Sequence, residues 1–518
     1  MKIIKVLRNV FVITDRFRFI SPCYTSLLFL AVAMATPAKS ASSSFKQFCQ
    51  NRTLTLNMFL SSLVMLLHLM SCQTSKSNDD EKRVPNKTTA DSLMAVLDQK
   101  IPQWQQMLHV PNVGIGMIEN GKIAKIKVYG NLKNKQPAPV NTLFNVASVT
   151  KVVFGTLVLK LVQNGDWKLD EPLYKYHVDP DVKDDPRHQL LTTRHVLSQQ
   201  SGFVNWRWNH PSKKLTFDFD PGTKFNYSGE GMEYLRKALE KKFNQSLSRL
   251  ADSLLFKPLK MNDTRHTWDG KTGIERFSYW YDAEGKEHLE QDYSTSDNAA
   301  DDIMTTVDDL AKFGVDVLNG AGLSQELFAE MVKAQATINP NLQQGLAWRV
   351  VNGLPEGEYA IQHGGNDIGV ATLLLLLPKS KRGLVIFTNG DSGIVMCNNI
   401  VRSVYKFGKS IIHKSYKSTP VDAIPKQVTV AQDILKKYIG TYVQPSGRKV
   451  VIEQSQDGLL LKMAGVPNLV LLPEANDTFF LLDFDPKIKF LKVTNDQAQQ
   501  LNIIEGENAI ECKRVEKK

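Results

Sequence analysis

The feature that most constrains the fold is the location of the strand signals, which lie on both sides of a long helix-like region. Two alternating apolar runs over residues 113–130 flank Asn120-Gly121, the dipeptide most typical of a two-residue β-hairpin turn. Strand-like runs return much later, at 346–352, 371–378 and 383–390. A sheet that begins before residues 150–320 and finishes after them requires this mostly helical region to be an insertion beside the sheet. A cleft between the two parts is then the natural site.

The pattern indicates an α+β fold for residues 86–410, with an antiparallel sheet, flanking helices and an all-α part. Apolar residues at helical spacing over 89–108 predict the first helix of this domain. The residues on its apolar side are Leu93, Val96, Leu97 and Ile101.

A second domain is predicted at the C-terminal end. Residues 411–432 contain Lys-Ser steps and two prolines, a composition typical of a linker. Short apolar runs separated by turn signals then occupy residues 433–518, which predicts a small all-β domain, a barrel or a sandwich. The runs are 449–454, 459–463, 468–473, 478–483, 488–493 and 501–505.

Residues 1–85 are predicted to be a targeting region and a tether. The apolar stretch 26–36 follows basic residues and precedes small residues, as a signal peptide does. A second apolar stretch, 58–70, leads to Cys72 in the sequence Leu-Met-Ser-Cys. This sequence resembles the lipobox of bacterial lipoproteins, in which the cysteine is acylated and becomes the new N-terminus. Both stretches are shorter than the roughly 20 apolar residues that a membrane span needs.

The polar segment after Cys72 has the composition of a flexible tether. We therefore expect an exported protein that a lipid on Cys72 holds at the membrane of the cell envelope, as a periplasm-facing or outer-membrane lipoprotein. Met1 and Met58 are alternative translation starts, and a buried hydrophobic helix over 58–70 is the alternative to export.

The distribution of charge argues against a nucleic-acid partner. The 518 residues are 42% hydrophobic and 23% charged, which is a globular balance, with a formal net charge of +11. Residues 1–72 contain eight Lys or Arg and one acidic residue, so they contribute +7 and leave +4 for the other 446. So small an excess predicts no polyanion partner. The five cysteines form no CxxC pair and no Cys/His cluster, so no metal site is expected.

Ser148 and Lys151 form a Ser-x-x-Lys motif. Residues three apart on a helix share a face, so the lysine amine reaches the serine hydroxyl. The positive end of the helix dipole and burial both favour the neutral amine, which can accept the hydroxyl proton. The same spacing occurs at Ser43–Lys46, Ser403–Lys406 and Ser446–Lys449. Only Ser148 follows an apolar entry and begins a long helical pattern, although a helix cap with a solvated lysine is the structural alternative.

Tyr227 is the second candidate for chemistry, in the Gly-rich segment 221–231 and two residues before Gly229. A phenol beside a lysine ammonium can shuttle protons to a leaving group. The structural alternative is a tyrosine with its ring in the core and its hydroxyl at the surface. Trp206 and Trp208, earlier in the chain, either line the cleft or anchor the helical region.

His363, Gly364, Gly365 and Asn366 form the third candidate group, directly before the strand-like run 371–378. Two glycines at a strand edge permit close approach of a ligand, whose oxyanion can accept main-chain N–H bonds. His363 either hydrogen-bonds a substrate carboxylate or carbonyl, or orients the tyrosine. A plain turn histidine is the structural alternative.

These three groups, in this order and with further matching stretches, resemble the serine β-lactamase-like family. That family comprises class C β-lactamases, D,D-carboxypeptidases, D-aminopeptidases and related esterases. The resemblance covers about residues 90–410, and the C-terminal domain resembles the accessory domain that often follows this module. The matching stretches are 144–151, 191–203, 225–231, 256–264, 305–313, 362–370 and 383–390.

The resemblance implies a β-lactamase/transpeptidase-like fold with Ser148 at the start of its central helix. It implies that Ser148 attacks an acyl carbon, that Lys151 activates it and that Tyr227 transfers the proton. The backbone N–H groups of Ser148 and Asn366 form the implied oxyanion hole, and water then hydrolyses the acyl-enzyme. The implied mechanism needs no metal or other cofactor.

Two departures from the family pattern bear on the substrate. The tyrosine motif is usually Tyr-x-Asn, but Gly229 stands at its third position here, so an amide expected to hold a substrate's side-chain amide is missing. His363 stands where class C β-lactamases carry the lysine of Lys-Thr-Gly, and neutral histidine supplies less positive charge for a β-lactam carboxylate.

We therefore expect an esterase or a D-amino-acid peptidase, acting on a small-molecule or peptide acyl substrate, rather than an efficient β-lactamase. The alternative is a non-catalytic relative that binds a cell-envelope component such as a peptidoglycan fragment. The sequence leaves the natural substrate and the oligomeric state open.

Overall fold

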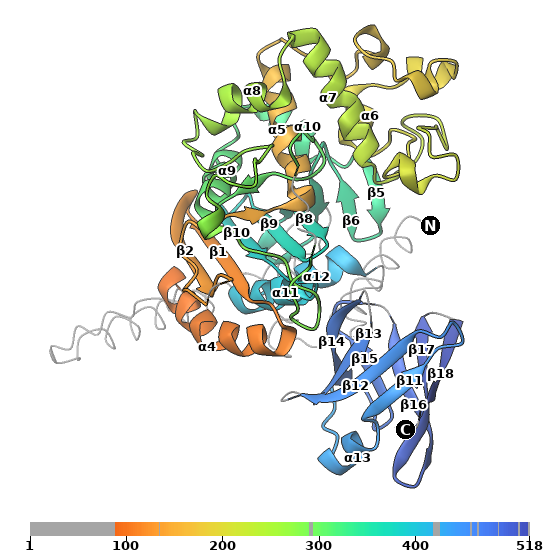
Figure 1. Ribbon diagram of the computed structural model, residues 1–518. Coiled ribbons are helices and arrows are strands. Elements are labelled where there is room, and N and C mark those ends of the chain that lie inside the picture. Colours follow the sequence, from red (N-terminus) through yellow and green to blue (C-terminus); the bar gives the residue numbers. More distant parts are fainter. Residues whose placement is uncertain are drawn as a thin grey trace, which may run out of the picture. The chain divides into compact units, whose positions relative to one another are not determined.

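An eight-stranded antiparallel sheet is the framework of the first domain, and its strands come from both ends of that domain (Figure 1). The strand order is β2-β1-β10-β9-β8-β7-β6-β5, so the N-terminal hairpin β1–β2 pairs with the late strand β10. This confirms the prediction that the sheet begins before the helical insertion and finishes after it. The strands are β1 (Asn112–Glu119), β2 (Lys122–Gly130), β5 (Ala336–Asn339), β6 (Leu342–Gln344), β7 (Arg349–Val351), β8 (Ala360–Asp367), β9 (Val370–Leu377) and β10 (Arg382–Thr388).

The computed structural model describes most of the chain after residue 88. The described ranges are 89–133, 135–289, 294–417, 425–455, 458–463, 466–484, 486–505 and 508–515. The predictions made for residues 1–85, including the lipidation of Cys72, lie outside these ranges. Among the described residues, every helix is too short or too polar to span a bilayer.

The predicted hairpin turn is present between β1 and β2. Asn120 and Gly121 have φ angles of 53° and 68°. Positive φ at both central residues is the requirement of a type I′ turn, whose twist matches that of the flanking strands. The Asn-Gly dipeptide therefore fixed this turn and the register of the hairpin.

The sheet is covered by helices on both faces, which explains the continuous apolar run of β9. Leu374 and Leu376 pack in one core with α5 and α9, whereas Leu373, Leu375 and Leu377 pack in the other core with α4, α11 and α12. A strand buried on both faces needs apolar residues at every position instead of alternate ones. The helices are α4 (Ala90–Leu108), α5 (Thr150–Gln163), α9 (Val307–Leu318), α11 (Gly393–Val404) and α12 (Gly408–Tyr416).

The inserted region between β2 and β5 holds the remaining helices of the first domain. They are α6 (Thr193–Leu197), α7 (Gly229–Phe243), α8 (Leu247–Ala251) with its π-helical continuation Asp252–Phe256, and α10 (Gln325–Val332). Two short strands, β3 (Phe144–Asn145) and β4 (Met304–Thr305), pair with each other. They join the entry to Ser148 to the segment directly before α9.

The C-terminal domain is a closed eight-stranded antiparallel barrel, which confirms the predicted all-β domain. A short helix, α13 (Gln432–Lys436), precedes it. The strands are β11 (Gly440–Val443), β12 (Lys449–Ser455), β13 (Gly458–Met463), β14 (Val466–Pro473), β15 (Thr478–Leu481), β16 (Lys487–Thr494), β17 (Gln497–Glu505) and β18 (Asn508–Arg514).

Four sequence expectations differ from the structure. Val96 is 41% exposed, because it lies on the flank of α4 and not on its buried stripe. Residues 257–303 are mostly turns and loops within the described ranges, with a single 3₁₀ turn at Ile274–Arg276, so this part is not helical as predicted. Helix α12 occupies the start of the predicted linker. Strands β11 and β18 lie outside the predicted apolar runs, because each has a single buried residue.

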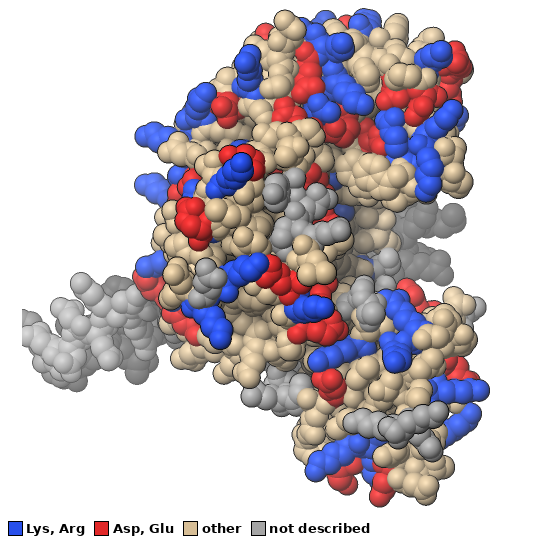
Figure 2. Space-filling model, viewed as in Figure 1, with Lys and Arg blue, Asp and Glu red and all other residues tan. Residues whose placement is uncertain are grey.

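The surface of the visible face mixes both signs of charge (Figure 2). Lys and Arg side chains alternate with Asp and Glu over the first domain and over the barrel. Cys397 and Cys512 are buried free thiols.

Arg514 stabilises the barrel at the junction of β11 and β18, the strand pair that closes it. Its guanidinium donates to the carbonyl oxygens of Lys437, Ile439 and Ala498 and to the hydroxyl of Tyr442. It also lies over the ring of Tyr442, 4.9 Å from the centroid. One side chain thus satisfies four acceptors from two segments, residues 437–442 and β17.

We predict that Arg514→Leu lowers the free energy of unfolding by about 2–3 kcal/mol, because partly buried carbonyl groups lose their donors. Urea denaturation followed by circular dichroism measures this change. The control is Lys513→Leu, at an exposed position of the same strand. Equal effects of the two substitutions contradict a role of Arg514 in closing the barrel.

Candidate active site

Ser148 lies in a short 3₁₀ turn, Ala147–Val149, that leads directly into α5. Ala147 has a φ of 45°, a left-handed conformation that is uncommon for residues other than glycine. Its N–H donates to Asn145 Oδ1 at 2.6 Å, which holds this turn in place. The Ser-x-x-Lys spacing therefore spans the junction of a 3₁₀ turn and an α-helix, and Ser148 is partly exposed at the surface of a cavity.

Lys151 is 1% exposed, and its amine has two defined partners. It donates to Ser148 Oγ at 3.0 Å and to the carbonyl oxygen of Ala300 at 2.7 Å. Its Nζ also lies 4.7 Å from the centroid of the Tyr227 ring. Lys151 is therefore not the solvated lysine of an ordinary helix cap. Its amine is buried, and these partners replace the hydrogen bonds to water that burial removes.

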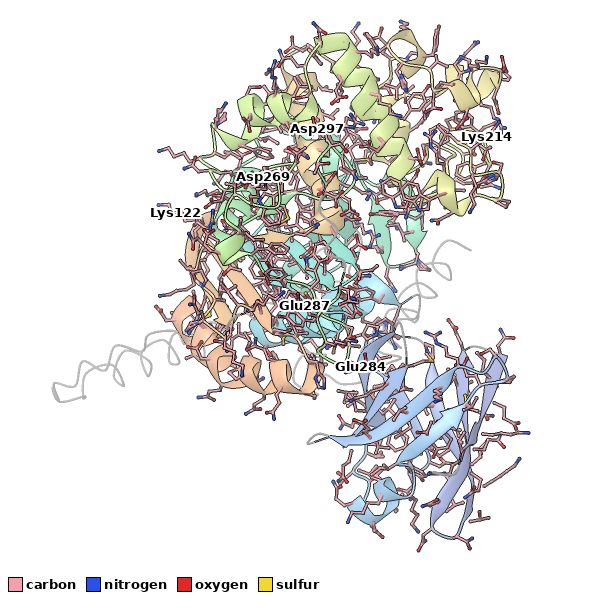
Figure 3. The ribbon with its side chains drawn as sticks, in the orientation of Figure 1. Lys122, Lys214, Asp269, Glu284, Glu287 and Asp297 are labelled. Atoms are coloured by element: carbon pink, nitrogen blue, oxygen red, sulfur yellow. The ribbon has the colours of Figure 1, made fainter. Side chains whose placement is uncertain are left out.

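The loop that supplies the Ala300 carbonyl is anchored by its own hydrogen bonds. Asp297, labelled in Figure 3, accepts bonds from the backbone N–H and the hydroxyl of Ser248. Glu233 of α7 accepts from the N–H of Ala299 at 2.7 Å, and Asn298 accepts from the N–H of Ala300 at 2.8 Å. The acceptor for Lys151 is therefore held by the helical region, not by the sheet.

Tyr227 precedes α7 and lies between two basic side chains. Besides Lys151, the guanidinium carbon of Arg349 is 5.6 Å from the centre of its ring. Cations over an aromatic face are attracted by the ring quadrupole. The ring is partly exposed and lines the same cavity as Ser148, so it is not a tyrosine packed into the core.

His363 is buried behind Tyr227, with the two ring centres 6.2 Å apart. Its Nδ1 is 2.8 Å from the carbonyl oxygen of Gly364, so Nδ1 carries the proton and donates it. Burial, together with the nearby Arg349 and Lys151, holds the pKa of His363 well below its usual value. The imidazole is therefore neutral, and its position beside the tyrosine favours an orienting role over contact with a substrate.

A cavity of about 430 Å³ brings together residues from the sheet, the central helix and the inserted region. Of the predicted site residues, the cavity wall includes Ser148, Lys151, Tyr227, Gly364, Gly365 and Asn366. His363 and Gly229 lie outside the wall. The wall also includes Trp206, which the sequence placed either at the cleft or among the anchors of the helical region. Further polar or aromatic residues of the wall were not assigned from the sequence: Asn205, Asp301, Arg349, Asp367, Thr372 and Tyr416. Only the nearby Trp206-x-Trp208 pair gave a sequence signal, because the others come from segments distant from Ser148 in the sequence.

The two glycines of β8 have different roles. A Cβ on Gly365 would lie 2.1 Å from the carbonyl oxygen of Val146 and 2.4 Å from Thr372 Oγ1. The close approach at Gly365 is therefore made by the segment before Ser148, not by a ligand. A Cβ on Gly364 would meet only the Thr372 carbonyl oxygen, at 3.5 Å, an ordinary contact.

Asp301 adds an acidic group to the cavity beside Lys151. Burial raises the pKa of its carboxyl to about 7, and the charges of Asp302 and Asp367 add to the rise, whereas Lys151 opposes it. A carboxyl that titrates near neutral pH inside a cleft is typical of functional sites. Asp301 also accepts from the backbone N–H of Asp302 at 3.0 Å, which fixes its orientation.

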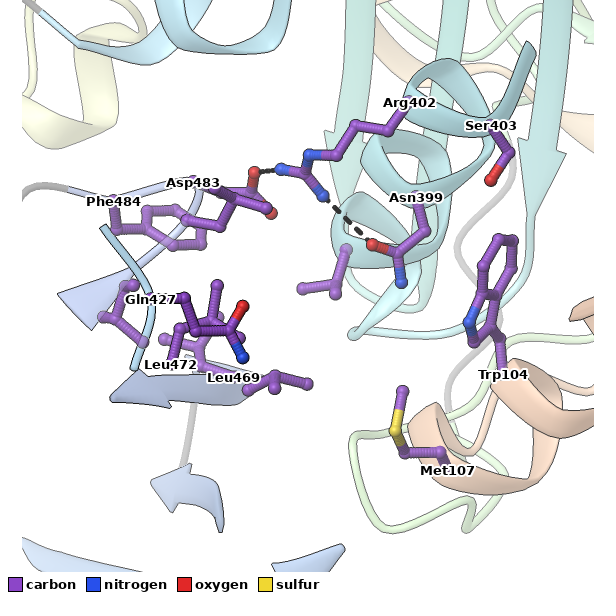
Figure 4. A pocket seen from close by; sticks show the side chains of 14 residues that line it. Trp104, Met107, Asn399, Arg402, Ser403, Gln427, Leu469, Leu472, Asp483 and Phe484 are labelled. Atoms are coloured by element: carbon purple, nitrogen blue, oxygen red, sulfur yellow. Dashed lines mark hydrogen bonds and ion pairs between the residues drawn. The ribbon is translucent and has the colours of Figure 1, made fainter. Parts of the chain in front are cut away.

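A second cavity, of about 390 Å³, lies beside α11 (Figure 4). There Arg402 forms an ion pair with Asp483, and burial lowers the pKa of the arginine to about 10. Ser403, which shares the Ser-x-x-Lys spacing, lines this cavity and accepts a bond from Lys100 at 3.4 Å. Lys406 is exposed, so the spacing alone does not build a site with a buried amine.

Comparison with known proteins gives a match to one family. The model of the family described as Beta-lactamase matches residues 97–396, more than half of the chain. Penicillin-binding protein 4* of Bacillus subtilis (strain 168) is 22% identical over 403 residues, which cover 70% of this chain and 85% of the relative. Protein flp of Staphylococcus aureus (strain N315) is 24% identical over 329 residues, or 60% of this chain and 65% of that protein.

Solved structures share the fold. The octameric penicillin-binding protein homologue from Pyrococcus abyssi is 19% identical with a TM-score of 0.54, covering 81% of this chain and all of that one. The D-alanine carboxypeptidase AmpC from Burkholderia cenocepacia is also 19% identical, with a TM-score of 0.52 and coverage of 61% and 99%. At these identities the likeness concerns the fold alone.

We predict that Gly365→Ala lowers stability by about 1–3 kcal/mol and disrupts the site, because the new methyl group forces β8 away from Val146. Differential scanning calorimetry measures the melting temperature. Gly364→Ala is the matched control, since its methyl group has room. A melting temperature that is the same for both variants contradicts the close packing at Gly365.

We also predict a pH-dependent effect of Asp301→Asn. The native state holds the Asp301 proton up to about pH 7, whereas an unfolded chain loses it near about pH 4. Between these values the native state binds more protons than the unfolded state, so the contribution of Asp301 to stability falls as pH rises. Asp301→Asn should therefore stabilise the fold by about 2–4 kcal/mol at pH 8 and by little at pH 4.

Thermal unfolding from pH 4 to pH 9 tests the effect of Asp301→Asn. The control is Asp91→Asn, because the Asp91 side chain is 78% exposed. A difference from the wild type that stays constant over this pH range contradicts the raised pKa of Asp301.

Proposed function

Because the chain belongs to the Beta-lactamase family, a family of serine hydrolases, we propose that it hydrolyses an ester or amide through an acyl-enzyme on Ser148. The observation that carries this proposal is the 3.0 Å hydrogen bond between the buried Lys151 amine and Ser148 Oγ at the wall of the cavity. Nucleophile and base within hydrogen-bond reach, with the base held by a third group, are what covalent catalysis requires. The Ala300 carbonyl is that third group.

In the proposed reaction, Ser148 Oγ attacks the acyl carbon and Lys151 accepts the hydroxyl proton. Tyr227, beside the lysine amine, passes a proton to the leaving group. The negative oxygen of the tetrahedral intermediate accepts bonds from the backbone N–H groups of Ser148 and Asn366. A water molecule then attacks the acyl-enzyme, and the same groups return the proton to Ser148.

The charges around the cavity support an ester or a D-amino-acid peptide as substrate over a β-lactam. The family lysine is absent at position 363, where a neutral, buried histidine stands. Arg349 provides a positive charge at the cavity wall from the neighbouring strand β7. A substrate carboxylate in this cavity would thus meet the charge of Arg349 and none at position 363.

The cellular setting belongs to the same proposal. We propose that the protein is exported and held at the cell envelope by a lipid on Cys72, as the sequence of the first 85 residues indicates. Its substrates are then acyl compounds or peptides of that compartment. A binding role for a peptidoglycan fragment without turnover is the second candidate, favoured by the departure at Gly229.

A fluorophosphonate probe should add one label to the wild-type protein and none to Ser148→Ala, measured by intact-mass spectrometry. Lys151→Ala should slow labelling by about 10²–10⁴-fold, because the base is lost. Ser403→Ala is the matched control, since Ser403 shares the Ser-x-x-Lys spacing and should leave labelling intact. Folded wild-type protein that takes no label, while a control hydrolase does, would favour the binding role.

A further inference from the structure

The loop segment 300–303 is bonded to the chain on both sides of Ser148. Before the serine, the N–H of Val146 donates to the carbonyl oxygen of Ile303 at 3.0 Å. After the serine, the hydroxyl of Thr150 accepts a bond from the N–H of Ile303 at 3.2 Å. These two hydrogen bonds fix the position of the segment relative to the proposed nucleophile.

Asp301 lies in this segment, directly after the residue that holds the lysine amine. The carbonyl oxygen of Ala300 accepts a bond from Lys151 Nζ at 2.7 Å, and the same Nζ lies 3.0 Å from Ser148 Oγ. Asp301, Lys151 and Ser148 all belong to the wall of the cavity of about 430 Å³. Because a water molecule takes up roughly 30 Å³, this cavity has room for an acyl group with a water beside it.

The backbone around Asp301 orients its carboxyl group. Asp301 Oδ1 accepts a bond from the N–H of Asp302 at 3.0 Å, and the N–H of Asp301 donates to Asn298 Oδ1 at 3.1 Å. Asp302 has a φ of 75°, a left-handed conformation that Asp and Asn adopt more readily than most residues. In the part of the chain that the structure describes, no residue donates a hydrogen bond to Asp301 Oδ2. A water in the cavity can therefore donate to this oxygen.

The surroundings of the Asp301 carboxyl make it a better proton acceptor than an ordinary carboxylate. Burial is the main cause that raises its pKa to about 7. Lys151 on α5 opposes the rise, whereas the neighbouring Asp302 and Asp367 at the end of β8 add to it. A carboxylate with a pKa near 7 is partly ionised at neutral pH and binds a proton more tightly than one with a pKa of about 4. The other titratable side chains of the cavity wall are Tyr227, Arg349, Cys397 and Tyr416.

Hydrolysis of an acyl-enzyme needs two proton transfers at different atoms. The attacking water must lose a proton, and Ser148 Oγ, which is then the leaving group, must gain one. Lys151 lies at hydrogen-bond distance from Ser148 Oγ, so its amine is in place to supply the proton to the leaving oxygen. A separate base near Lys151 lets both transfers take place, and the Asp301 carboxyl lies in the same cavity wall.

We propose that the Asp301 carboxylate is the general base that activates water for hydrolysis of the acyl-enzyme on Ser148. The water oxygen forms a bond to the acyl carbon while one water proton passes to Asp301 Oδ2. The bond between the acyl carbon and Ser148 Oγ then breaks, and the proton passes from Asp301 through the Lys151 amine to this oxygen. The acid leaves with the second water proton. This inference rests on the proposed acyl-enzyme and assigns the base of its second step.

Asp301→Asn separates the two steps of the reaction with p-nitrophenyl acetate. Stopped-flow release of nitrophenolate measures acylation, and intact-mass spectrometry after quenching measures decay of the acetyl-enzyme. Asp301→Asn should deacylate about 10²–10⁴-fold more slowly than the wild type, because the base is lost. The acetyl-enzyme should therefore accumulate in this variant. Its labelling by the fluorophosphonate should stay close to the wild-type rate, which also shows that the variant is folded.

Asp302→Asn is the matched control, one residue further along the same loop. Asparagine tolerates the left-handed conformation at this position and keeps an oxygen that can accept the bond from Asn298 Nδ2, which is 3.1 Å long in the native protein. This variant should retain deacylation at pH 8. Slowing of acylation and deacylation by the same factor in Asp301→Asn would overturn the proposal, because Asp301 would then act only through the nucleophile and its lysine.

The pH dependence of deacylation gives a readout that a purely structural role would not change. In the wild type the deacylation rate should rise with pH and level off above about pH 7, as Asp301 loses its proton. Asp302→Asn should move this midpoint to lower pH, because a negative charge beside Asp301 is removed. Asp301→Asn should lose the midpoint altogether. The same midpoint in Asp301→Asn as in the wild type would overturn the assignment.

The two reagents distinguish failure of this proposal from failure of the proposed hydrolysis. A wild-type protein that takes the fluorophosphonate and hydrolyses the ester, with deacylation unchanged in Asp301→Asn, overturns the role of Asp301 alone. A folded wild-type protein that forms no covalent adduct with either reagent overturns the acyl-enzyme on Ser148, and with it the role of Asp301.

Discussion

The site depends on one buried amine and on what holds it. Lys151 lies in the interior with almost no exposure, and an amine in that position requires partners that replace water. It finds them in Ser148, three residues earlier, and in the Ala300 carbonyl, about 150 residues later. The first partner is local and follows from helical spacing. The second partner links the central helix to a loop. Hydrogen bonds of Glu233 and Asp297 attach this loop to α7 and α8. The helical insertion therefore supports the Lys151 amine, the proposed base, and is more than a cover for the sheet.

The sheet forms the opposite wall of the cavity, and its strand β8 lies very close to the segment before Ser148. At Gly365 the strand β8 leaves no room for a side chain, because the carbonyl of Val146 and the hydroxyl of Thr372 occupy that space. The Thr372 hydroxyl donates to the same Val146 carbonyl, at 2.9 Å. Strand β8, the turn that carries Ser148 and the central helix α5 are thus held against one another. This packing sets the distance between Ser148 and Asn366, the two residues proposed to hold the oxyanion.

The cavity wall near Gly229 shows how the structure fills a position at which the sequence has no side chain. In the sequence, Gly229 lacks the amide of the family motif. In the structure, Trp206 fills the space beside Gly229, and the amide of Asn205 lies in the cavity wall. Arg207 and Glu230 hold the loop of Trp206 on the first turn of α7. Similarly, His363 supplies no charge, whereas Arg349 on the neighbouring strand does. Function in such a site follows from the positions of groups and not from their order along the chain.

The sequence by itself determined the local structure. Asn120-Gly121 specified a type I′ turn, the apolar run of β9 specified a strand buried on both faces, and the short runs after residue 440 specified an all-β domain. These signals are local because turn geometry and strand burial depend on a few neighbouring residues. The pairing of Ser148 with Lys151 was readable for the same reason. Strand β18 and the loops of 257–303 could not be predicted from the sequence, because exposed strands and long loops show little hydrophobic pattern.

Only the tertiary structure decided which further residues surround Ser148. Asn205, Asp301 and Arg349 come from two loops and a neighbouring strand, and no spacing in the sequence relates them to the nucleophile. His363 lies behind Tyr227, and Trp206 fills the space beside Gly229. Both arrangements depend on packing between segments that are distant in the sequence. The sequence thus identified the hydrogen-bonded pair Ser148 and Lys151, because its two residues lie within one helical turn. The other residues of the cavity wall come together through long-range contacts, which form only when the sheet and the helical insertion pack together.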